Sequence, residues 1–211
     1  MVARKHKVRA LAVWLACACA HGCVASSRGR SANTAAARQP ECDCSVFIEG
    51  ELTPFARCLR RTGDAYNMEP TVLAEVSQHD PSSSFEVWSS CGVFHARRDG
   101  RALQTQMFDN GPDPFCNGFA RYVHDGKYGY MNRALDVLVA PQYDFAFPFG
   151  GRRGIVCNDC THERVDEYTA ISCAHCGAVD QSGTLVVPLG LTSQQMFVRY
   201  PSAECEEAQS P

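Results

Sequence analysis

The chain has 211 residues, of which 20 are basic and 23 are acidic, giving a formal net charge of −3. Four of the basic residues stand among the first nine positions, so the rest of the chain is distinctly acidic. Proteins that bind polyanions carry basic patches, and none is visible, so the sequence predicts no nucleic-acid partner. The 13 cysteines indicate an oxidising compartment, where disulfides persist.

Residues 1–22 are predicted to be a signal peptide. Basic side chains at positions 4, 5, 7 and 9 precede an apolar run from Ala10 to Ala20, and no acidic residue occurs before Glu41. A bilayer needs about 20 apolar residues, so this run is too short to span one. Its length suits the apolar region of a signal peptide.

The end of this segment can be interpreted in two ways. Ala18-Cys19-Ala20 fits an ordinary cleavage site, which would release a periplasmic or secreted protein. Ala20-His21-Gly22-Cys23 resembles a bacterial lipobox, in which Cys23 is lipidated and becomes the new N-terminus. We favour the lipobox, which predicts an exported lipoprotein of the cell envelope, held to the membrane by its lipid anchor. Val24 after the cysteine implies the outer membrane.

Two observations agree with lipidation of Cys23. Residues 23–41 are rich in Ala, Ser and Arg and almost lack large apolar side chains, so this segment is predicted to be a flexible tether. Loss of Cys17 and Cys19 with the signal peptide, together with lipidation of Cys23, would leave ten cysteines. That number is even, so all of them could form disulfides.

The remaining chain is predicted to fold as an all-β protein. Residues 42–70 form a Cys-rich cap stapled by disulfides, because Cys42, Cys44 and Cys58 stand there. Residues 71–190 alternate short Val-, Phe-, Tyr- and Leu-rich runs with Gly, Asn, Asp and Pro, a pattern typical of short strands and turns. Residues 191–211 follow as a C-terminal segment. Hairpin turns are expected at four dipeptides that contain glycine: Asp99-Gly100, Asn110-Gly111, Asp125-Gly126 and Ser182-Gly183.

Self-similarity within residues 71–190 indicates a repeat protein. The best unit reads Tyr128-Gly129-Tyr130-Met131-Asn132, then Val137-Leu138-Val139-Ala140-Pro141, Tyr143-Asp144, Pro148-Phe149 and Gly154-Ile155-Val156. A second unit opens at Gly177-Ala178-Val179-Asp180 and continues through Gly183 to Pro188. An earlier unit contains Cys91-Gly92-Val93-Phe94, and Leu73-Ala74-Glu75-Val76 is predicted to be half of a further unit.

These residues resemble the WG-repeat family, which is known from many exported bacterial proteins. Tyr128 and Cys176 stand where that family has its signature Trp, and Leu135 stands where the hairpin has Gly. The resemblance implies tandem short β-hairpin repeats stacked into one domain, because an isolated hairpin is marginal in water and stacked neighbours share a core. The signature positions are Gly92, Tyr128, Gly129, Tyr143, Asp144, Pro148, Phe149, Gly177, Asp180 and Gly183.

The resemblance also implies a non-catalytic binding or scaffold protein with a protein or envelope partner and no cofactor, because most members of the family have no known activity. The residue pattern agrees, since nucleotide-binding and nucleophile motifs are missing. His162-Glu163 and Asp166-Glu167 lack a second His and are interpreted as a solvated polar loop. Arg152 and Arg153 are interpreted as solvated charges at a strand edge. A secreted enzyme with an unrecognised site is a further hypothesis.

Two C-x-x-C motifs carry the second hypothesis for function. Cys157-x-x-Cys160 and Cys173-x-x-Cys176 have spacing typical of a structural zinc site. Disulfides are favoured over zinc, because antiparallel closure of the intervening insertion would bring Cys157 to Cys176 and Cys160 to Cys173 as two nested clips. A thioredoxin-like redox site would need a βαβ context that the sequence lacks.

Overall fold

The computed structural model describes residues 41–79, 84–166, 168–201 and 205, which all belong to one compact unit, residues 38–211. The predicted signal peptide, the lipid-anchor residue Cys23 and all but the last residue of the predicted tether lie outside the described residues. Neither helix found in the described part of the chain is long and apolar enough to cross a membrane.

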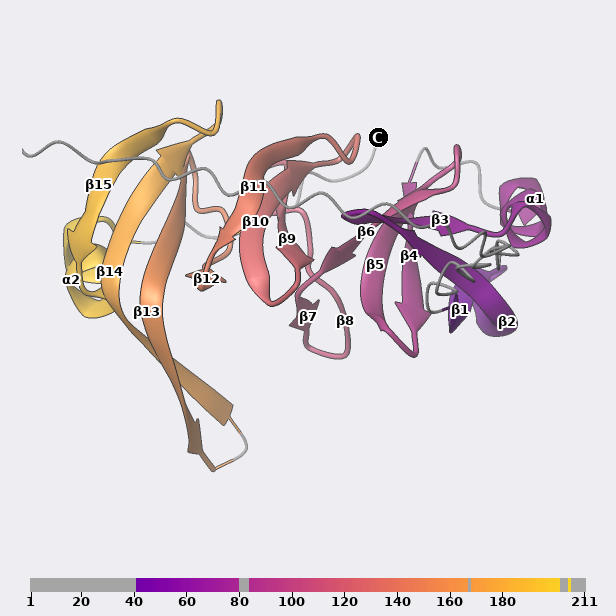
Figure 1. Ribbon diagram of the computed structural model, residues 1–211, viewed down its shortest axis with the longest axis horizontal. Coiled ribbons are helices and arrows are strands. Elements are labelled where there is room, and N and C mark those ends of the chain that lie inside the picture. Colours follow the sequence, from indigo (N-terminus) through magenta and orange to yellow (C-terminus); the bar gives the residue numbers. More distant parts are fainter. Residues whose placement is uncertain (1–40, 80–83, 167, 202–204, 206–211) are drawn as a thin grey trace, which may run out of the picture. The chain divides into compact units, whose positions relative to one another are not determined.

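The predicted all-β fold class is confirmed, because strands form most of the described chain (Figure 1). The N-terminal elements are β1 (Glu41–Ile48), β2 (Glu51–Thr62), β3 (Ala65–Met68), α1 (Pro70–His79), β4 (Ser84–Ser89), β5 (Gly92–Arg97) and β6 (Arg101–Thr105). The middle elements are β7 (Met107–Phe108), β8 (Gly111–Pro112), β9 (Phe119–His124), β10 (Lys127–Asn132) and β11 (Val137–Tyr143). The C-terminal elements are β12 (Phe145–Ala146), β13 (Arg153–Val165), β14 (Tyr168–Asp180), β15 (Leu185–Leu191) and α2 (Ser193–Arg199).

The first six strands close on themselves. The nine-stranded sheet runs in the order β11-β10-β9-β6-β3-β2-β1-β4-β5, and β5 pairs in addition with β6, so β1 to β6 form a ring. Alternation in β1 points Cys42, Cys44 and Val46 into this ring, where they join the largest buried cluster. The stapled segment predicted for residues 42–70 is therefore part of the same sheet as β4 to β6.

Disulfides brace the ring at two places. Cys44 on β1 bonds Cys58 on β2, and Cys42 bonds Cys91 in the turn before β5. The disulfide stapling that the sequence predicts near the N-terminus is therefore present.

The half repeat predicted at Leu73–Val76 is wrong, because these residues lie in helix α1. Pro70 is the first helical residue, where its missing N–H costs nothing, and Val72 and Val76 face the core one turn apart. A segment of four residues, three of them apolar, is too short to show the period that separates a strand from a helix.

Three of the four predicted turns stand where the sequence places them. Asp125 and Gly126 connect β9 to β10 with φ of 47° and 73°, and Gly100 and Gly183 have positive φ in their own turns. The fourth turn is shifted by one residue, because Asp109 and Asn110 take the left-handed positions and Gly111 begins β8. Asn and Asp tolerate this conformation better than other side chains, so glycine is not required.

A second sheet, in the order β12-β13-β14-β15, packs against the β10–β11 hairpin. Tyr130 lies fully buried between them, and its hydroxyl donates to the carbonyl oxygens of Phe147 at 2.6 Å and Ile155 at 3.0 Å. Gly154 allows this approach, because a Cβ there would lie 2.5 Å from the Tyr130 ring. The hairpin units therefore stack as the sequence predicts, with the Tyr130 ring against Gly154 inside a shared apolar core.

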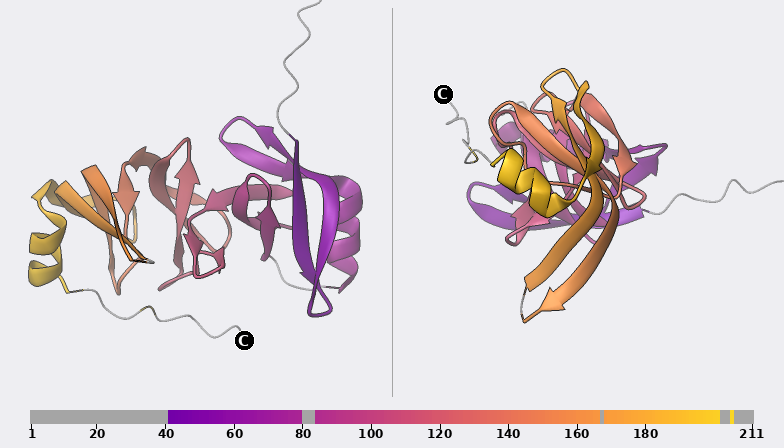
Figure 2. Two further views of the ribbon diagram at one scale, coloured as in Figure 1. Left: turned by 90° about the horizontal axis from the view of Figure 1, so that it is seen from below. Right: turned by 90° about the vertical axis from the view of Figure 1, so that its left-hand side faces the viewer.

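Helix α2 covers the other face of the second sheet (Figure 2). A capping box starts the helix, in which Thr192 and Gln195 each accept the other's backbone N–H. Met196 is fully buried among Cys157, Cys173 and Cys176. A terminal repeat needs a cap for its outer face, and α2 supplies it.

Candidate functional site

Two hairpins share one irregular register, which identifies them as copies of the same unit. Both pairings, β10–β11 and β14–β15, shift at the same two places. Adding 48 to each residue number of the first pairing gives the second, as the following pairs show: Tyr128–Tyr143 and Cys176–Leu191, Tyr130–Val139 and Ala178–Val187, Met131–Val137 and Val179–Leu185.

The signature glycines explain this irregularity. A Cβ at Gly129 would lie 2.0 Å from the Val139 carbonyl oxygen, and a Cβ at Gly177 would lie 2.4 Å from that of Val187. Only glycine allows the backbone of the neighbouring strand to come so close. The structure therefore gives both glycines the same task at equivalent positions.

The hairpin turn is repeated as well. In the second copy the Asp180 carboxylate accepts the Thr184 N–H at 3.0 Å, and Gly183 has φ of 82°. In the first copy the Asn132 side-chain oxygen accepts the Asp136 N–H at 2.9 Å. Leu135 stands 48 positions before Gly183 and adopts φ of 57°, although leucine avoids this region. Its side chain is fully buried, so apolar contacts offset the strain.

The position of the family's signature Trp holds an aromatic ring in one copy and a disulfide in the other. Tyr128 packs against Phe145 with ring centroids 5.0 Å apart, and its hydroxyl donates to the Gln106 side chain at 2.5 Å. Its equivalent, Cys176, bonds Cys157 on β13. The disulfide thus fills the place of the ring in the last sheet, below α2.

Gly92, the signature glycine predicted for the earlier unit, has a different environment. It begins β5 with φ of 125°, and a Cβ would meet the side-chain nitrogen of Gln104 rather than a backbone carbonyl. The pairing of β5 with β6 is regular. This hairpin therefore lacks the register that the two later copies share.

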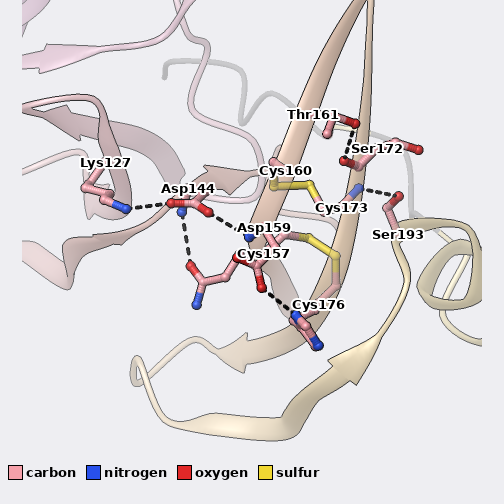
Figure 3. The surroundings of a disulfide bond; sticks show 12 residues. Lys127, Asp144, Cys157, Asp159, Cys160, Thr161, Ser172, Cys173, Cys176 and Ser193 are labelled. Carbon is pink, nitrogen blue, oxygen red and sulfur yellow. Dashed lines mark hydrogen bonds and ion pairs between the residues drawn. A yellow bond between two sulfur atoms is a disulfide. The ribbon is translucent and has the colours of Figure 1, made fainter.

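The four cysteines of the C-x-x-C motifs form the two nested disulfides that the sequence favours (Figure 3). Cys157 lies opposite Cys176, and Cys160 lies opposite Cys173, across the β13–β14 ladder. Positions three apart on a regular strand face opposite sides, yet both disulfides pack in the α2-side core. Asp159 resolves the conflict, because its φ of 53° interrupts the alternation between the two cysteines.

Asp144 holds this interrupted strand in place. Its carboxylate accepts the Asp159 N–H at 2.6 Å and pairs with the Lys127 ammonium at 2.5 Å (Figure 3). The Lys127 hydrogen bond, followed by the Asp159 N–H, lowers the pKa of Asp144, and the Cys160 N–H contributes in the same direction. The Asp144 N–H in turn donates to the Asn158 side chain at 3.2 Å.

Pro148 and Phe149, the last signature residues of the first copy, close the unit. Phe149 is buried, with its ring 5.2 Å from that of Tyr130 and edge-on to it. The Asn117 side chain donates to the Phe149 carbonyl at 2.9 Å, next to the disulfide that joins Cys116 to Cys205. Tyr143 pairs with Tyr128 and is buried in the same core.

The polar residues of the predicted insertion do not form a loop. His162 and Glu163 lie on β13, and Asp166 lies in the turn of one long hairpin formed by β13 and β14, whose distal part reaches beyond β12 and β15 (Figure 1). His162, Glu163 and Asp166 are exposed, as the sequence predicts. The strands continue because their ladder is regular from residue 160 to the turn.

Sequence reasoning missed a buried polar cluster. Arg121 on β9 forms an ion pair with Asp113, and the two side chains are 6% and 2% exposed. The His95 Nε2–H donates to the Asp113 carbonyl oxygen, 2.8 Å away, and burial lowers the pKa of this imidazole. His95 lies on β5, Asp113 lies in the loop after β8, and Arg121 lies on β9. Because these elements are separate in the sequence, no local pattern could have predicted the cluster.

The comparisons with known proteins agree with the repeated geometry. Residues 128–157 match the family model described as the WG containing repeat. This match spans all but the first residue of the β10–β11 hairpin, Asp144, and the first part of β13 up to Cys157. No curated protein and no solved structure matches the chain.

Proposed function

We propose that this chain, which carries a WG containing repeat at residues 128–157, is a non-catalytic binding or scaffold protein that works outside the cytoplasm. The repeated bulged register of β10–β11 and β14–β15 is the observation that carries this proposal. Glycines and disulfides fix the two units, and repeat proteins of this kind use rigid surfaces to bind partners.

The ionisable groups of the core support a non-catalytic role. Among the described residues, the buried imidazole, carboxylate and guanidinium groups are those of His95, Asp113 and Arg121, and these engage one another. A catalytic acid or base has to face a substrate, whereas this cluster joins β5, β9 and the loop after β8. Its arrangement suits a structural role.

Five disulfides join the ten cysteines of the described residues, which indicates an oxidising, extracellular compartment. We extend this to the cell envelope, with a lipid on Cys23 as the anchor and an outer-membrane location. A periplasmic or secreted protein without the anchor is the alternative. Cell fractionation separates them: Cys23→Ser should move the protein from the membrane to the soluble fraction.

Cys17→Ser is the matched control for that experiment, because it changes a cysteine of the predicted signal peptide outside the lipobox. It should leave the protein in the membrane fraction. A Cys23→Ser protein that still sediments with membranes, or a mature N-terminus at His21, would contradict the anchor.

The partner can be sought by site-specific cross-linking in the native envelope. Phe47, Leu52 and Phe108 keep about half of their residue surface exposed, at 49%, 49% and 52%, so a photoreactive residue there should not disturb the core. We expect at least one of these positions to trap a discrete envelope component. Glu163, which is exposed on the distal part of the β13–β14 hairpin, serves as the comparison position. Cross-links that are equally diffuse at all four positions would contradict specific binding.

A structural zinc or redox module is the second candidate, and one observation favours it. The sulfur atoms of Cys157, Cys173 and Cys176 all lie within 4.8 Å of one another, and Cys160 is bonded to Cys173. A dithiol reductant that supplies four electrons and four protons would reduce both disulfides to four thiols, and these would release their protons on binding one Zn²⁺ as thiolates. A redox role of the thioredoxin type is less suited, since each cysteine pairs across the ladder and not within its own C-x-x-C.

Mass spectrometry with and without reductant, combined with metal analysis, decides between the candidates. Protein isolated from its native compartment should have all four cysteines oxidised and bind no stoichiometric metal. Four free thiols with one equivalent of zinc would promote the zinc module and remove the disulfide interpretation.

A further inference from the structure

Three arginines converge on a pocket that belongs to no site described above. The pocket has a volume of about 340 Å³ and lies between the turn that precedes β13 and the end of α2. Arg152 and Arg153 come from the turn and the start of β13, and Arg199 is the last residue of α2. They are its only charged lining residues within the described part of the chain.

The arginines that line this pocket have no carboxylate partner among the described residues. The ladder does place Arg153 opposite Asp180. The Asp180 carboxylate is turned away into its own hairpin turn, where it accepts hydrogen bonds from Ser182 and from the Thr184 N–H. Those bonds lower the pKa of Asp180, so it is an anion that is already engaged elsewhere.

Tyr200 arranges two of the guanidinium groups. The Arg153 guanidinium carbon lies 5.1 Å from the Tyr200 ring centroid, and that of Arg199 lies 5.7 Å from it. Stacking on a ring limits the freedom of both side chains before any ligand arrives. Pro148 and Ile155 add apolar walls, while the three arginine side chains stay accessible to a ligand from solvent.

We propose that this pocket binds the phosphate or carboxylate group of a small polyanionic ligand. Guanidinium groups match both oxyanions with paired, parallel hydrogen bonds, which an ammonium group cannot form. The site is notable in a chain with a net charge of −3, because it concentrates positive charge that is scattered in the sequence. Arg152 and Arg153 are exposed, as the sequence predicts. The sequence could not bring Arg199 to them, because it joins them only through the packing of α2 on the sheet.

The chain itself contains an alternative occupant, since Glu204, Glu206 and Glu207 follow the pocket residue Pro201. The test must therefore distinguish a free ligand from these glutamates. It must also distinguish a built site from general attraction between an anion and the arginines of the surface.

Isothermal titration of the purified, oxidised protein with inorganic pyrophosphate and with citrate tests the proposal. Arg153→Gln should weaken binding by about tenfold or more, the value of one charge-assisted hydrogen bond. Arg153→Lys should weaken it less, because the charge remains. The control is Arg164→Gln, which removes one exposed positive charge on the distal β13–β14 hairpin, and binding should be unchanged. Unchanged melting midpoints show that each variant is folded.

A preference for pyrophosphate or for citrate would support the site and assign the oxyanion class. Equal losses in Arg153→Gln and Arg164→Gln would overturn the proposal in favour of diffuse attraction. The proposal also fails if the wild-type protein binds neither anion. Binding that appears only after Glu204, Glu206 and Glu207 are changed to Gln would overturn it as well, because the glutamates would then be the occupant. None of these outcomes depends on the export or the envelope partner of the protein.

Discussion

Asp144 accepts the backbone N–H of Asp159 at 2.6 Å, and Asp159 is the residue whose left-handed conformation separates the two disulfides of β13. Asp144 belongs to the first repeat and Asp159 to the strand that carries the C-x-x-C motif. One carboxylate thus joins the matched repeat to the strand that carries the two disulfides. Without this carboxylate, the Asp159 N–H would lose its hydrogen-bond acceptor.

Asp144→Asn is therefore expected to loosen the β13 kink. It keeps the shape of the side chain but removes the charge that attracts Lys127 and the backbone donors. The cost should be about 1–2 kcal/mol, in the range of hydrogen bonds to partly exposed charged groups. Chemical denaturation measures this. Asp136→Asn serves as the comparison, because the Asp136 carboxylate accepts a hydrogen bond from the Asn132 side chain at 3.1 Å rather than from the backbone of β13.

The contribution of the Asp144 carboxylate to stability should depend on pH. The pKa of Asp144 is lower in the folded protein than its ordinary value of 3.8, so its contribution is complete above that value. The contribution is lost as the pH falls from 3.8 through the lower folded pKa. Stability of the wild type should therefore drop more steeply than that of Asp144→Asn in this window. Parallel curves for the two proteins would show that Asp144 adds no pH-dependent stability.

Gly129→Val should destabilise the first repeat by about 1–3 kcal/mol through overpacking. The new side chain would begin 2.0 Å from the Val139 carbonyl oxygen, so strand β11 has to move. Gly190→Val is the control, because a Cβ there meets nothing within 4 Å and its φ is not in the left-handed region. A melting midpoint for Gly129→Val that equals that of Gly190→Val would contradict the repeated register.

Leu135 offers a test of strain against burial. Leu135→Ala should cost about 2–5 kcal/mol, because it empties a fully buried site and keeps an L-residue at φ of 57°. Leu135→Gly loses slightly more apolar surface but relieves a strain of about 1–2 kcal/mol. We expect the glycine variant to be at least as stable as the alanine variant. A clearly less stable glycine variant would mean that this turn is not strained by leucine.

The sequence supports the fold class and the repeated unit because strands, turns and signature glycines are local features. Asp125-Gly126 needs only its two neighbours to make a turn, and Gly129 needs only the facing strand. The nested pairing of Cys157 with Cys176 was predictable for the same reason, since antiparallel closure of one segment fixes it.

The features that sequence reasoning missed depend on distant contacts. Helix α1 is stabilised because Val72 and Val76 pack against the core of the strand ring. A window of ten residues does not show this contact. The ion pair of Arg121 with Asp113 and the approach of Arg199 to Arg153 arise only when separate elements pack. Polar groups of this kind have no period, so the hydrophobic pattern carries no trace of them.

The nested disulfides should not contribute additively to stability. Cys160–Cys173 closes a segment with a sequence separation of 13, and Cys157–Cys176 closes one of 19 around it. An isolated loop of about 15 residues is worth about 3 kcal/mol in the chain-entropy model. When one of the two bonds remains, it still holds the hairpin closed. Replacing either pair of cysteines by alanine should therefore lower the free energy of unfolding by clearly less than about 3 kcal/mol. Replacing both pairs should cost more than the sum of the two single losses.

The Cys44–Cys58 bond provides the matched control, because its separation of 14 is almost that of the inner bond. The bond that encloses it, Cys42–Cys91, spans 49 residues and leaves the shorter segment largely free in the unfolded chain. Removing Cys44–Cys58 should therefore cost close to the full 3 kcal/mol or so expected of an isolated loop. Unfolding in denaturant under oxidising conditions measures all four variants. Equal losses for Cys160–Cys173 and Cys44–Cys58 would show that nesting does not reduce the contribution, and that strain or packing in the β13–β14 hairpin governs it instead.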